Sequence, residues 1–282
     1  MARVLVIEDN PVNMKLAVHL LDSAGHAVLR AVDAETGMTL ARAELPDLIL
    51  MDFQLPGMDG MAATALLKQD AATAAIPVIA LTAVAMNTDL ARKRAAGCDA
   101  YLAKPLRYQE LYAAIDLLLP GGARQAFGIS GAFHPGDAQE RSGLGSASSP
   151  DTHGGATPAV DVGILESLVG SDPAVIFEFL DTFRISTARI APELKAACTD
   201  HQALLAGRHA HKLKSSSHAV GALALGGLCA AMETAGKAGS TETLLSLLPR
   251  FELELAAVNT FLNSLLATDT LGNAAEKLSG PM

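Results

Sequence analysis

The chain has 282 residues, half of them hydrophobic, and a formal net charge of −9 at pH 7. This length predicts one or two domains with ample apolar material for a core. The acidic balance argues against a nucleic-acid partner, because no basic stripe is available to neutralise phosphates. Cys98, Cys198 and Cys229 are isolated in the sequence, so they fit neither a disulfide framework nor a zinc site and indicate a reducing cytoplasm. The uncharged windows at 71–88 and 215–232 are interpreted as soluble elements without membrane insertion.

Residues 1–119 contain short β-rich runs that alternate with amphipathic helical patterns, each bounded by turn or capping residues. The expected strands are 3–7, 27–31, 48–52, 77–82 and 100–103, and the expected helices are 11–23, 34–43, 60–68, 90–96 and 106–119. Asn10 and Asp33 are expected N-caps, while Gly25 and Gly97 are expected to end the helices before them. Five strands in alternation with five helices predict an α/β fold with a doubly wound parallel sheet.

Polar side chains stand at the carboxyl ends of the expected strands. The central strand has four apolar residues followed by Asp52, which suits a strand buried on both faces. Glu8 and Asp9 follow the first strand, Thr82 ends the fourth and Lys104 follows the last. Because parallel strands end at one edge of the sheet, we expect all five side chains in one crevice. Each residue taken alone is equally compatible with a helix cap or a surface ion pair.

These residue types indicate a particular chemistry. Three carboxylates this close would repel one another, and some would take up protons unless a cation lay among them. A few hard oxygen ligands that leave room for water suit Mg²⁺. Lys104 and Thr82 on the opposite rim would offer donors to an incoming anion. The pattern therefore predicts a phosphoryl-transfer site with a carboxylate nucleophile, a metal, and cations that balance the transferring oxygens.

Residues 1–119 resemble a response-regulator receiver domain, close to the stand-alone cell-cycle receivers of the DivK type. The matching segments are Val-Leu-Val-Ile-Glu-Asp-Asn at 4–10, Leu-Ile-Leu-Met-Asp at 48–52, Leu-Pro-Gly-Met-Asp-Gly at 55–60, Ala-Leu-Thr-Ala at 80–83 and Lys-Pro at 104–105. The resemblance implies a flavodoxin-like sheet in which Asp52 accepts the phosphoryl group. It also implies that Asp9, Asp52 and the backbone carbonyl of Gln54 hold Mg²⁺, with Glu8 assisting through a water molecule.

The same resemblance implies roles for the opposite rim. Lys104 and Thr82 would contact the phosphoryl oxygens, and the Lys104–Pro105 peptide would be cis. Tyr101 matches the aromatic switch residue of the family, which rotates inward as the residue at the position of Thr82 moves toward the phosphate. The resemblance thus predicts a two-state face formed by Thr82 and Tyr101.

The remainder of the chain divides into three segments. Residues 120–159 are rich in Gly, Ser and Pro and are expected to be a flexible linker. Residues 160–266 carry helical periodicity and predict an antiparallel four-helix-bundle domain, and 267–282 are expected to be a loose tail. The expected helices are 161–169, 173–198, 201–220, 223–237 and 241–266. Pro192 should kink or restart the second of these helices.

The helix expected at 201–220 holds the reactive candidates of this second domain. One face, assigned to solvent, carries His211, Lys214, Ser215 and His218, and the opposite face, assigned to the bundle interior, carries Leu205, His209, Leu213 and Val220. His209 and His211 point in directions roughly 200° apart, so they cannot bind one metal. His209 is interpreted as a packed or capped histidine. An exposed His211 would be nucleophilic near pH 7, and Lys214 could hold the charge of a phosphoryl group; the alternative is a solvated polar face.

This helix resembles the histidine phosphotransfer (HPt) signature. The matching segments are Ala-His-Lys-Leu-Lys-Ser-Ser-Ser at 210–217 and Val-Gly-Ala at 220–222. In the family a Leu, a Lys and small residues follow the phosphorylated His, and His211 has all of them. His209 and His218 do not. Ser215 stands where many relatives have Gly. The resemblance implies that His211 accepts phosphate, with Lys214 beside it.

The predicted function is that of a two-component phosphorelay intermediate rather than an enzyme. The sequence has no Gly-rich ATP-binding block, so phosphate would come from a hybrid histidine kinase and pass to a downstream response regulator in a Mg²⁺-dependent transfer. One alternative is a docking adaptor that is controlled by phosphorylation and whose helical bundle transfers nothing. Another is a haloacid-dehalogenase-type phosphatase, but Gln54 occupies the place of its second Asp.

Overall fold

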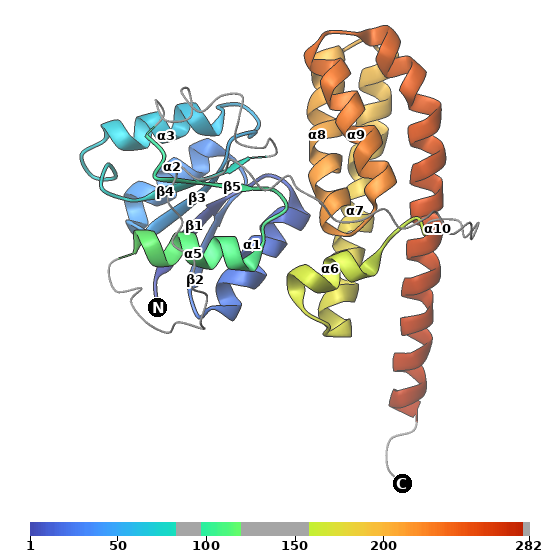
Figure 1. The fold of residues 1–282 in the computed structure, drawn as a ribbon, viewed down its shortest axis with the longest axis horizontal. Helices are drawn as coiled ribbons and strands as arrows, with labels where there is room; N and C mark the ends of the chain where they lie inside the picture. The colour runs from blue at the N-terminus through green and yellow to red at the C-terminus, as the bar shows by residue number, and fades with distance from the viewer. Residues whose placement is uncertain (83–96, 120–157, 279–282) are drawn as a thin grey trace, which may run out of the picture.

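The computed structural model describes residues 1–82, 97–119 and 158–278. The first unit contains strands β1 (Arg3–Ile7), β2 (Ala27–Ala31), β3 (Leu48–Asp52), β4 (Val78–Thr82) and β5 (Ala100–Ala103). They form one sheet in the order β2-β1-β3-β4-β5, and every neighbouring pair is parallel (Figure 1). This confirms the predicted doubly wound, five-stranded parallel sheet.

The first unit has four helices among its described residues, and the first two of them begin at the predicted capping residues. The four helices are α1 (Pro11–Ser23), α2 (Ala34–Glu44), α3 (Gly60–Gln69) and α5 (Tyr108–Leu118). The side chain of Asn10 accepts a hydrogen bond from the backbone N–H of Val12 at 2.9 Å, and that of Asp33 accepts one from Thr36 at 2.7 Å. These bonds satisfy N–H groups that have no partner within the helix. The helix predicted at 90–96 lies outside the described residues.

Alternate residues of each strand pack on opposite faces of the sheet. Val4 and Val6 belong to a cluster with α1 and α5, whereas Leu5 and Ile7 belong to a cluster with α2 and α3. Helices therefore cover both faces, which explains why the strands are continuously apolar. Polar side chains therefore gather at the carboxyl ends of the strands.

The second unit is entirely helical in its described residues. Its helices are α6 (Val162–Val169), α7 (Pro173–Thr199), α8 (Ala203–Ala219), α9 (Leu223–Lys237) and α10 (Thr241–Leu278). Between α8 and α9 the backbones approach closely, because a Cβ atom added to Gly207 would lie 3.1 Å from the Cα atom of Gly236. Because neither glycine has a side chain, α8 can lie directly against α9 at this point.

Helix α7 continues through Pro192 without a restart, which leaves the kink as the predicted effect of this proline. Pro192 is exposed together with Ala188, so the carbonyl that proline deprives of a helical partner is on the solvated side. One detail differs from the sequence predictions. Helix α10 continues to Leu278, beyond the predicted end at Leu266, and it projects past the rest of the bundle in Figure 1. Residues 267–278 contain no proline, so no residue in this segment forces the helix to end.

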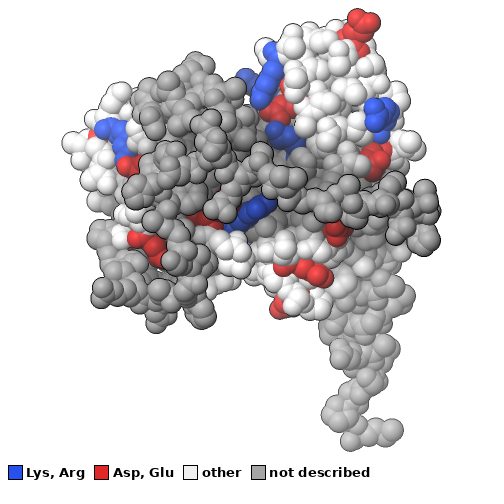
Figure 2. Space-filling model, viewed as in Figure 1, with Lys and Arg blue, Asp and Glu red and all other residues white. Residues whose placement is uncertain are grey.

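Helix α1 lies between the sheet and the helical unit, where it contacts α6, α7 and α8 (Figure 1). We call this region the α1 contact. Met14 of α1 and Val175 of α7 are partly buried against one apolar cluster that includes residues of both units. Figure 2 shows the Lys and Arg side chains of one face in small groups, several of them beside Asp or Glu. Among the described residues, none of the helices has the length and apolarity needed to cross a membrane.

Candidate functional site

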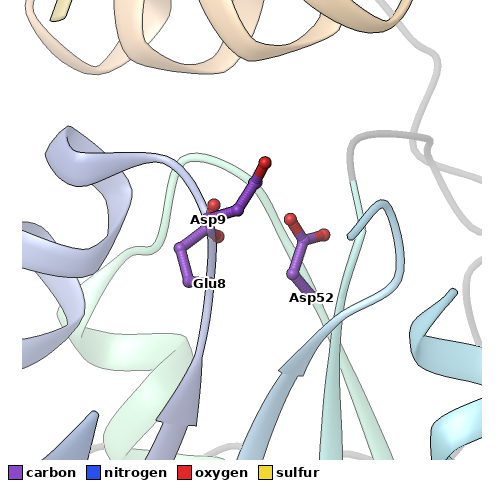
Figure 3. A group of neighbouring side chains, drawn as sticks. All are labelled: Glu8, Asp9 and Asp52. Carbon is purple, nitrogen blue, oxygen red and sulfur yellow. The ribbon is translucent and has the colours of Figure 1, made fainter. Parts of the chain in front are cut away.

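Three carboxylates meet at the carboxyl edge of the sheet. Glu8 and Asp9 directly follow β1, and Asp52 ends β3, its neighbour in the sheet. One oxygen from each of the three carboxylates lies within 4.8 Å of the others, as Figure 3 illustrates. Glu8 and Asp52 are only 1% and 2% exposed. The predicted acid cluster is therefore present, and its charges are removed from bulk water.

Lys104 lies between two of these acids. Its Nζ atom is 2.5 Å from Oε2 of Glu8 and 2.8 Å from Oδ2 of Asp52. Burial, together with the neighbouring charge of Asp52, raises the pKa of Glu8 to about 8, although Lys104 opposes the rise. Burial by itself lowers the pKa of Lys104, but the charges of Asp52 and Glu8 outweigh it and hold that pKa above its usual value. The lysine is thus a fixed cation at the acid cluster.

The neighbouring loops complete the surroundings of Asp52. Its Oδ1 atom accepts a hydrogen bond from the backbone N–H of Gln54 at 3.0 Å. Thr82 ends β4, and its carbonyl oxygen accepts the backbone N–H of Lys104 at 2.8 Å, which joins the ends of β4 and β5. The Lys104–Pro105 peptide is cis, as predicted. The Tyr101 ring packs edge-on against Phe53, with centroids 6.4 Å apart.

Gly60 leaves space for the backbone of Asp52, which leads to a stability prediction. A Cβ atom at position 60 would lie 2.0 Å from the backbone oxygen of Asp52. We expect Gly60→Ala to lower the free energy of unfolding by about 1–3 kcal/mol in urea denaturation, because the chain must shift to admit the methyl group. Gly227→Ala, in helix α9 with nothing within 4 Å of an added Cβ, should be stabilising by up to about 1 kcal/mol. Equal effects of the two substitutions would contradict this interpretation.

The donor set of the acid cluster fits a divalent metal ion. Lys104 contacts Glu8 and Asp52 from the buried side, whereas Asp9 lies on the rim with its side chain 7% exposed. In Figure 3 the Asp9 and Asp52 carboxylates point to the same side of the sheet edge. Small, hard oxygen ligands of this number match magnesium better than a softer metal. Glu8, Asp9 and Asp52 are therefore the residues that could hold the ion.

In the helical unit, His211 lies on α8 in contact with a carboxylate of α9. Its Nδ1 atom is 3.1 Å from Oε1 of Glu233, and Nζ of Lys214 is 2.5 Å from Oε2 of the same residue. Lys237 approaches Oε1 of Glu233 at 2.5 Å. The Nε2 atom of His211 is buried and has no hydrogen-bond partner among the described residues. Nδ1 is thus held by Glu233, and Nε2 is the ring nitrogen that could react.

Comparison with known proteins identifies both units. The family model described as response regulator receiver domain matches residues 4–116, and the one described as Hpt domain matches residues 178–261. PilH of Pseudomonas aeruginosa is 40% identical over 121 residues, which cover 43% of this chain and 100% of PilH. The chain belongs to the response-regulator receiver family. Its helical unit is an Hpt domain.

A second curated relative agrees with the assignment of the receiver domain, and a solved receiver domain is also similar in sequence. The polar-differentiation response regulator DivK of Brucella anthropi is 46% identical over 103 residues, 36% of this chain and 84% of that protein. The receiver domain of a sensor histidine kinase from Pseudomonas aeruginosa, solved with a magnesium ion in its active site cleft, is 35% identical. That match has a TM-score of 0.40 and covers 42% of this chain and 96% of the other.

The prediction that His211 is exposed is wrong, because the residue is 5% exposed. Lys214 and His218, assigned with it to solvent, also face α9: Lys214 binds Glu233, and the His218 ring lies about 3.0 Å from the place of a Cβ on Gly226. Leu205, assigned to the interior, is 39% exposed. The error has a physical cause: the polar face of α8 finds a carboxylate on α9, and small residues let the two helices approach.

Glu233 is the residue of the Hpt domain that sequence reasoning missed. Its side chain is buried, with the residue 4% exposed, and three basic side chains lie within ion-pair distance of its carboxylate. Its burial raises its pKa, but hydrogen bonds from His211, Lys214 and Lys237 outweigh that effect and hold the pKa well below the usual range. The available signal was its position as the single acidic residue of the helix at 223–237. His209 instead lies 3.3 Å from Glu193 of α7.

Proposed function

We propose that this chain is a phosphorelay intermediate that carries a phosphoryl group on Asp52 and on His211. It would pass the group between a hybrid histidine kinase and a downstream response regulator. The observation that carries the proposal is the pairing of Asp52 with the buried ammonium of Lys104 at 2.8 Å, in the same chain as an Hpt histidine. The three free cysteines are compatible with the reducing cytoplasm that this role requires.

In the receiver domain, a carboxylate oxygen of Asp52 would attack the phosphorus of a phosphohistidine. The O–P bond forms as the P–N bond breaks, and the leaving imidazole nitrogen retains the electron pair. Lys104 is already 2.8 Å from Oδ2 of Asp52, so its ammonium would meet the oxygens of the arriving group. Thr82, at the adjacent strand end, would donate to another phosphoryl oxygen and, with Tyr101, report the change to a partner.

Magnesium would bind at the acid cluster of the receiver domain. Asp9, Asp52 and the backbone carbonyl of Gln54 are the proposed ligands, with Glu8 assisting through a water molecule. When bound, the ion supplies positive charge that screens the phosphoryl oxygens from the carboxylates. The cluster of three oxygens within 4.8 Å supports this assignment.

In the Hpt domain, Glu233 would position His211 for attack through Nε2. A proton on Nδ1 shared with the carboxylate at 3.1 Å leaves the Nε2 lone pair available. Lys214, held by the same carboxylate, would face the charge of the transferred group. The matched families are a receiver domain and an Hpt domain, and under this proposal a separate histidine kinase would supply the phosphate.

Phosphate transfer from a radiolabelled phosphorylated kinase tests the proposal on the full chain. We expect an acid-stable label at Asp52 and an acid-labile label at His211. His211→Gln should remove the acid-labile label and all transfer to a downstream receiver, while His209→Gln, at the histidine that pairs with Glu193, should retain both. Downstream transfer that survives His211→Gln would refute the relay.

One observation favours a second candidate, the docking adaptor. His211 is 5% exposed, and α8, which carries it, contacts the receiver domain through α1. A bundle that only docks needs no accessible histidine. Under this alternative, phosphorylation of Asp52 would alter partner binding equally in the native chain and in His211→Gln.

A further inference from the structure

The α1 contact joins the receiver and Hpt domains through specific polar pairs. Nζ of Lys15 lies 2.8 Å from Oε2 of Glu178 on α7. Nε2 of His19 lies 3.2 Å from the carbonyl oxygen of Val169, and the His19 ring packs edge-on against Phe179 with centroids 6.0 Å apart. These contacts come from one face of α1, so they set how the bundle lies over the end of the sheet.

Helix α8 reaches the acid cluster at the end of this contact. Nζ of Lys212 forms an ion pair with Oδ2 of Asp9 at 2.6 Å. The side-chain amide of Asn10 donates a hydrogen bond to the backbone carbonyl of Lys212 at 2.7 Å. The first bond depends on the lysine side chain, while the second holds the α8 backbone whatever that side chain does.

The position of Lys212 conflicts with a metal ion at the same carboxylate. A divalent ion bound to Asp9 would bring two cations to one carboxylate, and their repulsion is weakly screened because the Asp9 side chain is only 7% exposed. We propose that Lys212 is a built-in counter-ion of the receiver's acid cluster, which Mg²⁺ must displace from Asp9 in order to bind. This inference rests on the proposed magnesium site and adds the residue that regulates its occupancy.

The surroundings allow such an exchange without unfolding. A cleft of about 570 Å³ between α1 and α7 is lined by Glu8, Asp9 and Phe179, so a small ion reaches the cluster from solvent. Lys212 is 25% exposed and has a flexible stem that can move its ammonium into water. The Asn10 bond and the Lys15–Glu178 pair do not involve the displaced ammonium, so they would keep the domains in place.

Zero-length carbodiimide cross-linking of the full chain tests the ion pair directly, because the reagent converts a contacting carboxylate and amine into an amide. Without metal, peptide mass spectrometry of the monomer should recover Asp9–Lys212 and Lys15–Glu178 links. Saturating Mg²⁺ should abolish the first link and leave the Lys195–Glu252 link, within the Hpt domain, unchanged. An Asp9–Lys212 link that is absent without metal, or that persists with it, would overturn the proposal.

A calorimetric titration of Mg²⁺ gives a second readout. Removal of the competing charge in Lys212→Met should lower the Kd for Mg²⁺ roughly three- to tenfold, whereas Lys212→Arg should keep the native Kd. Lys195→Met, which removes a remote charge of the same domain, should also keep it. Equal affinity in Lys212→Met and the native chain overturns the role of Lys212 and leaves the metal site intact. Absence of Mg²⁺ binding in all four proteins would instead refute the proposed site.

Discussion

Asp52→Asn should abolish the acid-stable phosphoryl label of this protein. An amide oxygen is a far poorer nucleophile than a carboxylate, so we expect the rate of receiver phosphorylation to fall by more than about a hundredfold. Lys104 would still pair with Glu8 at 2.5 Å, so the pocket would retain a fixed cation. The measurement is the initial rate of label transfer from a phosphorylated kinase, with near-native circular dichroism to establish folding.

Asp59→Asn is the matched control for this loss. Asp59 caps α3 through a 2.8 Å hydrogen bond from the backbone N–H of Ala62, and asparagine caps a helix about as well as aspartate. The control should therefore transfer phosphate at the native rate. If Asp52→Asn acquired the acid-stable label at the native rate, the phosphoryl group would have to reside on another carboxylate.

Glu233→Gln should strongly destabilise the Hpt domain. The substitution leaves two lysines and His211 around a neutral amide in a site where the residue is 4% exposed. We expect a loss of about 2–4 kcal/mol in the free energy of unfolding, together with slower labelling of His211. Glu166→Gln, at an exposed residue of α6, should change the free energy by less than about 0.5 kcal/mol.

This destabilisation should depend on pH in a defined direction. The pKa of Glu233 is lower in the folded protein than its ordinary value of 4.5, so the unfolded chain binds more protons as the solution is acidified. The stabilisation is complete above that ordinary value and is lost as the pH falls below it. The difference in unfolding free energy between the native chain and Glu233→Gln should therefore be constant near pH 7 and shrink below about pH 4.5. A difference that grows with acidification would contradict the assigned direction.

The sequence by itself determined the sheet and the acid cluster. Each strand is a short apolar run whose successive side chains point to opposite faces of the sheet, and both faces are covered by helices. Because the strands are parallel, all their carboxyl ends lie at one edge. Glu8, Asp9 and Asp52 were predicted at that edge from the strand pattern, and the structure makes β1 and β3 neighbours, which brings the three acids together. Caps such as Asn10 were equally predictable, since capping bonds span only two or three residues.

Only the tertiary structure decided which helix faces are covered. The rotation of α8 against α9 depends on the meeting of Gly207 with Gly236, a contact between residues distant in the sequence. That rotation turned His211 toward Glu233 rather than toward solvent. The ion pair of Lys212 with Asp9 likewise depends on how α1 meets the bundle. Periodicity shows which side chains share a face, but the partner of that face is set by the packing of whole helices.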